Sequence, residues 1–261
     1  MELTADSKVV DLFGLNVFAM RMDEVLDLCE RHIKKREALL LGVVNAAKIV
    51  NSRRDIQLRK SLDETDIILA DGLPIVWVSK LIGRPLPERI AGIDIMLELI
   101  KRSGKEHYSI YFLGATNEVV HKVAEMVEGW YPGVVIAGCH DGYFDESQEI
   151  QVVEEIKQSH ADILFVAMGS PKKENFLRKW RTYMDVPVCH GVGGSFDVVA
   201  GVTRRAPHWM QQAGLEWFYR MMQEPRRLWK RYFVTNSIFI MLSIKEFINA
   251  RLNITKLRSS V

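Results

Sequence analysis

The sequence predicts an α/β protein built on a doubly wound, mainly parallel sheet of about six strands, with a small N-terminal β-hairpin and an all-helical C-terminal appendage. Two observations support this prediction. Six short apolar runs lie between residues 39 and 190, and segments with helical spacing of apolar residues separate them. Such runs are too short for helices and suit strands buried on both faces. Strands that alternate with helices favour right-handed crossovers, and therefore a parallel, Rossmann-like sheet.

The elements follow one another regularly along the chain. Residues 9–18 are predicted to form the hairpin, with Gly14 near its turn, and residues 22–33 an amphipathic helix. The predicted strands cover residues 39–44, 67–70, 109–113, 134–139, 162–168 and 186–190. The predicted helices between them cover residues 46–62 with a break at 51–54, then 74–81, 93–101, 117–131, 147–160 and 172–183. The loops that follow parallel strands should converge at one edge of the sheet.

From Arg204 onward the strand pattern stops. Residues 215–222, 225–233 and 234–252 are predicted helices, so we divide the chain into an α/β domain, 1–203, and a helical appendage, 204–261. Residues 204–231 contain seven Lys or Arg and two acidic residues, interleaved with Trp, Tyr and Phe, whereas the whole chain has a net charge of +2. This pattern fits a helix at a membrane interface, arginines turned inward onto a substrate diphosphate, or a packed helix pair with a solvated basic face.

The composition is that of an ordinary globular protein. The 261 residues are 48% hydrophobic and 26% charged, which allows a large core. Cys29, Cys139 and Cys189 are scattered without CxxC spacing, so we expect a reducing cytoplasm and neither a disulfide framework nor a zinc site. Residues 1–11 lack the apolar core of a signal peptide, and no apolar run reaches the roughly 18 to 20 residues that span a bilayer.

A carboxylate stands at the end of the second predicted strand. Residues 67–70 are apolar, and Asp71, Gly72 and Pro74 follow within the next few positions. A partly desolvated carboxylate at a strand end can act as a general base, because desolvation raises its pKa toward the working pH. The alternative is a cap for the following helix, and the local sequence does not separate the two. Arg89 and Gly92, downstream of this loop, could help to hold an anion.

Two other strand ends have features of anion-binding loops. Residues 191–197 read Gly-Val-Gly-Gly-Ser-Phe-Asp, in which successive N–H groups either cradle a phosphate or form an ordinary tight turn. Residues 169–174 begin a helix directly after a strand, where the helix N-terminus and Lys173 favour an anion, unless the pair of lysines is merely solvated. Neither loop matches GxGxxG or GxxxxGK[ST], which disfavours a nicotinamide-dependent oxidoreductase.

The sequence lacks the residue patterns that several kinds of enzyme chemistry require. No Asp-x-Asp pair occurs, although many sugar-nucleotide enzymes use one to clamp a metal-bound diphosphate. The seven histidines show no HExxH spacing, and Ser195 does not stand in a GxSxG elbow. We therefore expect no metal, no hydrolytic triad and no zinc chemistry. A nucleotide- or nucleic-acid-binding α/β module with a basic tail remains an alternative, although it does not explain polar residues at several strand ends.

Taken in order, the motifs resemble one family, the WecG/TagA/CpsF glycosyltransferases, from about residue 9 to residue 231. The first four motifs are Asn45-x-x-Lys48, Ala70-Asp71-Gly72, Pro87-Glu88-Arg89-x-x-Gly92-x-Asp94 and Gly169-x-Pro171-Lys172-x-Glu174. The motifs that follow are Gly191-Val192-Gly193-Gly194-x-Phe196-Asp197-x-x-Ala200-Gly201, Arg205-Ala206-Pro207-x-Trp209 and Gly214-Leu215-Glu216-Trp217-x-x-Arg220 to Glu224-Pro225-x-Arg227.

The resemblance implies a bacterial, inverting, metal-independent glycosyltransferase. Such enzymes move a sugar, often of the N-acetylmannosamine type or a related hexose or uronic acid, from a UDP donor to a polyprenyl-diphosphate-linked saccharide. Their products are cell-surface polysaccharides such as wall teichoic acid, capsule or exopolysaccharide. The resemblance also implies a catalytic domain at 1–203 and an appendage at 204–261 that completes the site and docks on the inner face of the cytoplasmic membrane. We expect no cofactor and no nucleic-acid partner, and a homo-oligomer is compatible with the sequence.

By this resemblance Asp71 is the catalytic base, and Asn45 and Arg89 line the same pocket, Arg89 as a second catalytic residue. From the motifs and strand ends, the further substrate-binding candidates are Gly72, Gly92, Gly114, Gly169, Pro171, Lys173, Glu174, Gly191, Gly193, Gly194, Phe196, Asp197, Arg205, Arg220 and Arg227. The chain departs from the family's usual pattern in having Val43 in place of Thr and Lys173 in place of Gln. These departures leave the identity of the sugar open.

Overall fold

The computed structural model describes residues 9–258, with side chains through residue 252 except that of Arg227. At its centre is a six-stranded sheet in the order β4-β3-β8-β7-β5-β6, in which every neighbouring pair is parallel. Its strands are β3 (Leu39–Val44), β4 (Ile67–Ala70), β5 (Ser109–Gly114), β6 (Val135–His140), β7 (Ile163–Ala167) and β8 (Val188–Gly191). The predicted doubly wound parallel sheet is thereby confirmed.

The N-terminal hairpin is also confirmed. It consists of β1 (Val9–Leu12) and β2 (Leu15–Phe18), which pair in antiparallel register across the turn at Gly14. Gly14 has a φ of 73°, a left-handed conformation that glycine adopts at little cost. Alternate residues of the hairpin point inward, so that Val10, Leu12 and Val17 are buried.

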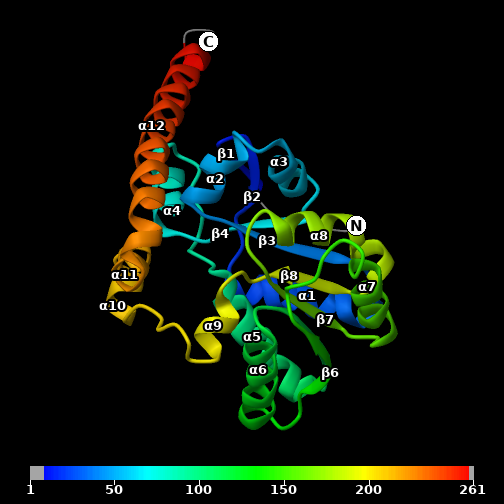
Figure 1. Ribbon diagram of the computed structural model, residues 1–261. Helices are drawn as coiled ribbons and strands as arrows, with labels where there is room; N and C mark the ends of the chain where they lie inside the picture. Colours follow the sequence, from blue (N-terminus) through cyan, green and yellow to red (C-terminus); the bar gives the residue numbers. More distant parts are fainter. Residues whose placement is uncertain (1–8, 259–261) are drawn as a thin grey trace.

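Helices cover both faces of the sheet (Figure 1). The helices between the strands are α1 (Met22–Lys35), α2 (Ala46–Ser52), α3 (Ile56–Asp63), α4 (Leu73–Leu81), α5 (Gly92–Glu106), α6 (Asn117–Trp130), α7 (Glu149–Gln158) and α8 (Lys172–Met184). Side chains of α1, α5 and α6 share one core with Leu39, Leu41 and Val43 of β3. Because strand side chains alternate between faces, Leu40 instead joins a core with α7 and α8.

The chain enters the sheet at β3, next to the edge strand β4, and the strand order decides which loops meet. It runs from β3 outward to β4, crosses to β5 and β6 on the far side, and returns through β7 and β8 to the other flank of β3. Because β4, β3 and β8 are neighbours and parallel, the loops after these three strands lie together at one edge of the sheet. Open α/β sheets bind their ligands at this edge, outside the carboxyl ends of the strands.

The C-terminal part is helical, as predicted, but the boundaries of its helices differ from the predicted ones. It contains α10 (His208–Gln212), α11 (Glu216–Gln223) and a single α12 (Pro225–Arg258) of 34 residues, instead of separate helices at 225–233 and 234–252. No glycine or proline follows Pro225 in α12 to end the helix. The short helices α9 (Ser195–Val199) and α10 were not predicted, because each is only five residues long.

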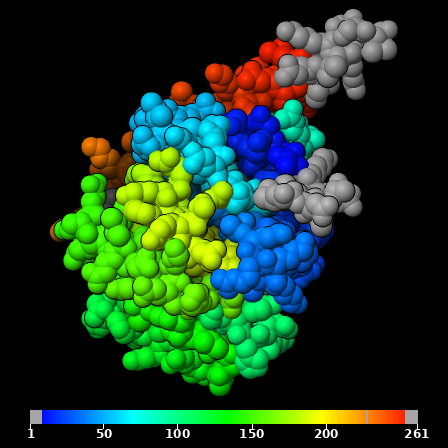
Figure 2. All heavy atoms as spheres, turned by 90° about the vertical axis from the view of Figure 1, so that its right-hand side faces the viewer, coloured from blue at the N-terminus to red at the C-terminus, as the bar shows by residue number. Residues whose placement is uncertain are grey.

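The long helix α12 packs against the α/β body instead of standing apart from it. In Figure 1 it runs along α4 and α2, and Figure 2 shows its end projecting beyond the rounded body. Phe239 is 5% exposed and its ring centroid lies 5.3 Å from that of Phe13 in the hairpin. The backbone N–H of Phe13 donates to Oε1 of Glu246 at 3.1 Å. The hairpin, α2, α4 and α12 thus share one apolar cluster.

Candidate active site

Asp71 follows the edge strand β4, at the rim where the strand-end loops meet. Its backbone N–H donates to the carbonyl of Val44 at 2.8 Å, which continues the pairing of β4 with β3. Gly72 holds the N-cap position of α4, and no side-chain hydrogen bond caps that helix. Asp71 is therefore not the helix cap, and within the described part of the chain no hydrogen bond reaches its half-buried carboxylate.

The surroundings of Asp71 raise the pKa of its carboxyl group from 3.8 to about 6. Burial is the largest cause, and the nearby carboxylate of Glu216 acts in the same direction. The cationic groups of Arg89, Arg220 and Lys48 oppose this rise. Asp71 is thus a carboxylate that is ionised at neutral pH yet basic enough to accept a proton.

Arg89 lies beside Asp71 because its loop continues the sheet. The N–H of Ile90 donates to the carbonyl of Ala70 at 2.9 Å. The Arg89 guanidinium is largely buried and has two anionic partners, Glu216 with Oε2 at 2.8 Å from Nη1, and Asp94 with Oδ2 at 3.2 Å from Nη2. Arg89 is held in place on both edges before any substrate arrives.

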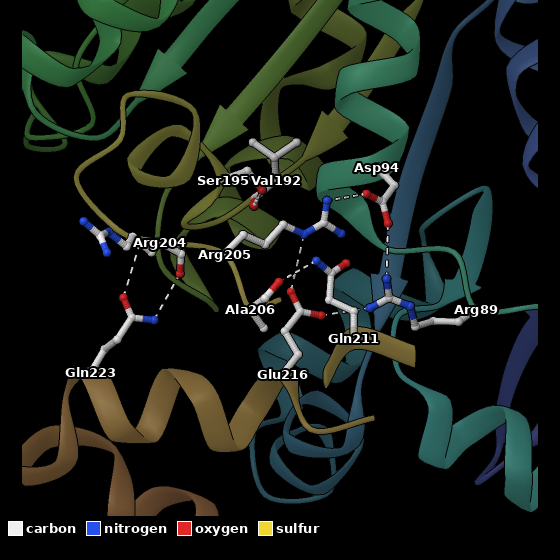
Figure 3. A network of polar contacts seen from close by, with 10 residues as sticks. All are labelled: Arg89, Asp94, Val192, Ser195, Arg204, Arg205, Ala206, Gln211, Glu216 and Gln223. Carbon is white, nitrogen blue, oxygen red and sulfur yellow. Dashed lines mark hydrogen bonds and ion pairs between the residues drawn. The ribbon is translucent and has the colours of Figure 1, made fainter. Parts of the chain in front are cut away.

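Arg205 closes a ring of alternating charges with these residues (Figure 3). Its Nη1 lies 2.7 Å from Oδ1 of Asp94, and its Nε lies 3.8 Å from Oε1 of Glu216. Asp94 belongs to α5 and Glu216 to α11, so this charge ring joins the α/β body to the C-terminal helices. The Nε and Nη2 of Arg205 are buried and have no hydrogen-bond partner among the described residues. The Nη2 amino group of Arg205 therefore makes no contact with a described carboxylate and could donate to an anion.

A second charged cluster lies between β3, β8 and the start of α8. Oε1 of Glu174 receives the ammonium groups of Lys48 at 3.0 Å and Lys173 at 2.7 Å, and all three side chains are at most 10% exposed. Nζ of Lys48 also donates to the carbonyl of Val43 at 2.6 Å. Burial and the Lys48 ammonium lower the pKa of Lys173 to about 8. For Glu174 burial acts to raise the pKa, but the two ammonium groups outweigh it and hold the pKa at about 2.

Comparison with known proteins decides what kind of protein has this site. The family model described as "Glycosyl transferase WecG/TagA/CpsF family" matches residues 10–253. This chain belongs to the WecG/TagA/CpsF glycosyltransferase family. A protein of Bacillus spizizenii (strain ATCC 23059 / NRRL B-14472 / W23) is 40% identical over 189 residues, which are 72% of this chain and 69% of the relative. A protein of Bacillus subtilis (strain 168) is 35% identical over 207 residues, 79% and 80% of the two chains. Both are named N-acetylglucosaminyldiphosphoundecaprenol N-acetyl-beta-D-mannosaminyltransferase.

Other predicted site residues of this glycosyltransferase also lie at the strand-end rim. Asn45 follows β3 and is near Gly72, but its Oδ1 accepts the N–H of Lys48 at 3.0 Å and so caps α2. Gly169 and Gly193 face open space, whereas Gly194 is exposed at the start of α9, close to the carboxylate of Asp197. Pro171, at the N-cap of α8, is also exposed.

Some predicted site residues of the glycosyltransferase fill its interior. Phe196 is 0% exposed and packs edge-on against Phe112 at 5.5 Å, so it belongs to the core and not to a surface open to substrate. A Cβ on Gly114 would lie 2.4 Å from the carbonyl oxygen of Ala167, which explains this glycine by the packing of β5 on β7. Gly92 is buried, and its carbonyl lies 3.1 Å from Nε2 of the buried His190. A Cβ on Gly191 would meet the Lys173 side chain at 3.1 Å.

The C-terminal arginines divide into three cases. Arg205 is in the charge ring, and Arg220 on α11 is exposed and close enough to Asp71 to lower its pKa. The side chain of Arg227 lies outside the part of the chain that the structure describes. Lys48, Asp94 and Glu216 were not predicted to have a role at the site, although all three stand in the quoted motifs. Each of them carries a charge opposite to that of another charged motif residue, and this pattern could have indicated that they form ion pairs at the site.

Among the described side chains, no three His, Cys, Asp or Glu residues gather closely enough to hold a metal ion. The described helices include none with the length and apolar character needed to cross a membrane.

Proposed function

We propose that this glycosyltransferase moves a sugar of the N-acetylmannosamine type, or a related hexose or uronic acid, from a UDP donor to a polyprenyl-diphosphate-linked saccharide, with inversion at the anomeric carbon. The proposed setting is the synthesis of a bacterial cell-surface polysaccharide. The names of both Bacillus relatives support the sugar and the acceptor, since they describe mannosaminyl transfer to N-acetylglucosaminyldiphosphoundecaprenol. Val43 and Lys173, at the Lys48–Glu174 cluster, are where a different sugar would be distinguished.

The observation that carries the proposal is the environment of Asp71. Its carboxylate is half-buried, accepts no hydrogen bond from a described residue and has a pKa raised to about 6. In the proposed reaction it takes the proton of an acceptor hydroxyl. That oxygen forms a bond to the anomeric carbon of the donor from the face opposite UDP, while the bond from this carbon to the phosphate oxygen breaks. UDP leaves with the electron pair, and a single displacement of this kind inverts the anomeric centre.

Fixed cations of the chain would stabilise the charge that develops on the leaving diphosphate. The guanidinium of Arg205, whose Nη2 has no hydrogen-bond partner among the described residues, and the exposed guanidinium of Arg220 lie near Asp71. Arg89 is the third cation of this group. Donors that are already oriented stabilise a transition state without reorganising during the reaction. Because these arginines supply positive charge at the site, we propose transfer that needs no metal ion and no cofactor.

In this proposal residues 1–203 form the catalytic domain, and residues 204–261 complete the site and meet the membrane. The exposed large apolar side chains of α11 and α12 support the second part. They are Phe218, Met222, Trp229, Phe233, Val234, Ile240, Met241, Ile244, Ile248 and Leu252. Exposed aromatic and aliphatic groups beside arginines suit the headgroup region of an anionic bilayer. The enzyme would then act at the cytoplasmic face, where it would reach a lipid-linked acceptor.

The proposal is tested with the full chain, a synthetic polyprenyl-diphosphate N-acetylglucosamine acceptor and a panel of UDP-sugars, with and without EDTA. We expect transfer from one UDP-sugar at the same rate in EDTA, a product of inverted anomeric configuration, and a thermal shift with UDP. Loss of transfer in EDTA that Mg²⁺ restores would contradict metal independence. Retained anomeric configuration would contradict the single displacement, and transfer from no UDP-sugar would contradict the donor class.

A further inference from the structure

Glu216 is the one member of the charge ring that α11 supplies. Its two carboxylate oxygens face different arginines, Oε2 at 2.8 Å from Nη1 of Arg89 and Oε1 at 3.8 Å from Nε of Arg205 (Figure 3). Asp94 bridges the same two arginines from the opposite side. The side chains of the ring are 15 to 32% exposed, so the ring is partly buried. Both guanidinium groups are therefore fixed in direction by two carboxylates each.

The connection between the α/β body and α11 is held at further points in the same view. Nε2 of Gln223 donates to the carbonyl of Arg204 at 3.0 Å, and the N–H of Arg204 donates to Oε1 of Gln223 at 3.3 Å. Nε2 of Gln211 donates to the carbonyl of Ala206 at 2.7 Å. These bonds join parts of residues 204–223 to one another. Glu216, in contrast, bonds to Arg89 of the body, so it holds α11 at the candidate site.

Glu216 also acts on Asp71 directly. Among the charged groups around Asp71, Arg89, Arg220 and Lys48 favour the ionised carboxylate, and Arg205 is close enough to be affected by it. Glu216 is the acidic group that opposes them and makes Asp71 more basic. A salt bridge with only a structural purpose would not require its carboxylate to lie near the catalytic base, where like charges repel.

We propose, on the basis of the function proposed above, that Glu216 is a positioning residue that couples the docking of α11 to the assembly of the catalytic centre. When α11 is docked, Glu216 holds Arg89 and Arg205 toward the site and places its own negative charge beside Asp71. When α11 is undocked, both arginines lose one of their two carboxylate partners. Catalysis then takes place only when α11 is docked, because only then do the base and the arginines that stabilise the leaving group lie together.

The test compares the full-length wild type with Glu216→Gln, which keeps the shape of the side chain and removes its charge. Hydrogen–deuterium exchange reports on docking without any substrate, and we expect faster exchange in residues 204–223 of the variant. A ¹³C NMR titration of the Asp71 carboxyl, assigned by its absence in Asp71→Asn, should give a lower pKa in the variant. Turnover should fall about ten- to a hundredfold, as expected for misplaced reacting groups.

Two further variants make the test specific. Glu216→Asp retains the charge, so its Asp71 titration should lie closer to the wild type than that of Glu216→Gln. Glu128→Gln removes an exposed carboxylate on α6 and should match the wild type in exchange, titration and turnover. Wild-type exchange and an unshifted Asp71 titration in Glu216→Gln would overturn the proposal. Because both of these measurements need no substrate, they decide it even if the wild type transfers no sugar and the proposed function fails.

Discussion

Nη1 of Arg89 lies 2.8 Å from Oε2 of Glu216, although the two residues are 127 positions apart in the sequence. Arg89 comes from the loop that flanks β4, and Glu216 from the helix that precedes α12. Two segments that are far apart in the sequence therefore build the candidate site. A substitution in α11 can remove a partner of Arg89 without touching Asp71, and among the described residues Asp71 has no hydrogen bond to the charge ring.

Asp71→Asn should lower turnover by about 10² to 10⁴, the usual contribution of a general base. The substitution preserves size and removes the ability to take a proton. UDP binding should stay within a factor of about three, because the proposed diphosphate ligands are arginines and not Asp71. Steady-state transfer and calorimetric UDP titration measure the two quantities. Normal turnover in this variant would exclude Asp71 as the base.

The pH dependence of transfer should reflect the raised pKa of Asp71, about 6. The group must be ionised to accept a proton, so activity should be full above this pKa and fall as pH decreases through it. Below it, kcat/KM should drop about tenfold for each pH unit, since the fraction ionised falls at that rate. Rates measured from pH 4.5 to 8.5 test this, and the acidic limb should be absent from the residual activity of Asp71→Asn. Activity that stays full down to pH 4.5 would mean that the raised pKa is not that of the working base.

The sequence was sufficient to predict the sheet because the signal for each strand is local. Runs such as Leu39–Val44 and Ile67–Ala70 are apolar throughout, and polar residues follow at once. The same locality explains why Asp71 could be singled out. Its role could not be separated from that of a helix cap, because only the structure has Gly72 in the N-cap position.

What the sequence could not supply was the pairing of distant charges and the direction of side chains. Asp94 and Glu216 become partners of Arg89 only when α5 and α11 are brought together. Phe196 follows a glycine-rich loop, yet its ring turns into the core, because Gly193, with a φ of 57°, lets the chain turn into α9. The motifs thus identified the loops that form the candidate site, but not which residues of each motif are open to a ligand.

Glu174→Gln should destabilise the protein by about 3–5 kcal/mol at pH 7, because it leaves two buried ammonium groups without their counter-charge. Both Lys48 and Lys173 approach Oε1 of this carboxylate within 3.0 Å. Urea unfolding measures the loss. Since the Glu174 pKa is lowered from 4.5 to about 2, the wild type should keep this stabilisation above pH 4.5 and lose it as pH falls toward 2.

Lys173→Met provides the control for that experiment. It leaves one ammonium group for one carboxylate, and removes a lysine whose pKa is already lowered to about 8 by burial and by Lys48. The cost should stay below about 1.5 kcal/mol, as for an apolar replacement of similar volume. Equal losses in the Met and Gln variants would show that packing, and not charge balance, stabilises this cluster.

Phe239→Ala should destabilise the protein by about 3–5 kcal/mol, the usual cost of emptying a buried aromatic site. Phe239 is 5% exposed and packs on Phe13, so the loss would loosen α12 from the hairpin. Phe233→Ala is the matched control on the same helix. This residue is 70% exposed, so its removal should change stability by no more than about 0.5 kcal/mol.

The same pair of variants separates the two tasks of α12. Phe239→Ala should weaken docking of the helix, and with it the activity on a water-soluble acceptor analogue, because α11 and Glu216 precede α12 in the chain. Phe233→Ala should leave that activity intact and weaken binding to anionic vesicles, which sedimentation measures. Deleting residues 208–261 could not distinguish these effects, since it would also uncover the cluster around Phe13. Equal vesicle binding by Phe233→Ala and the wild type would argue against this face of α12 as the membrane contact.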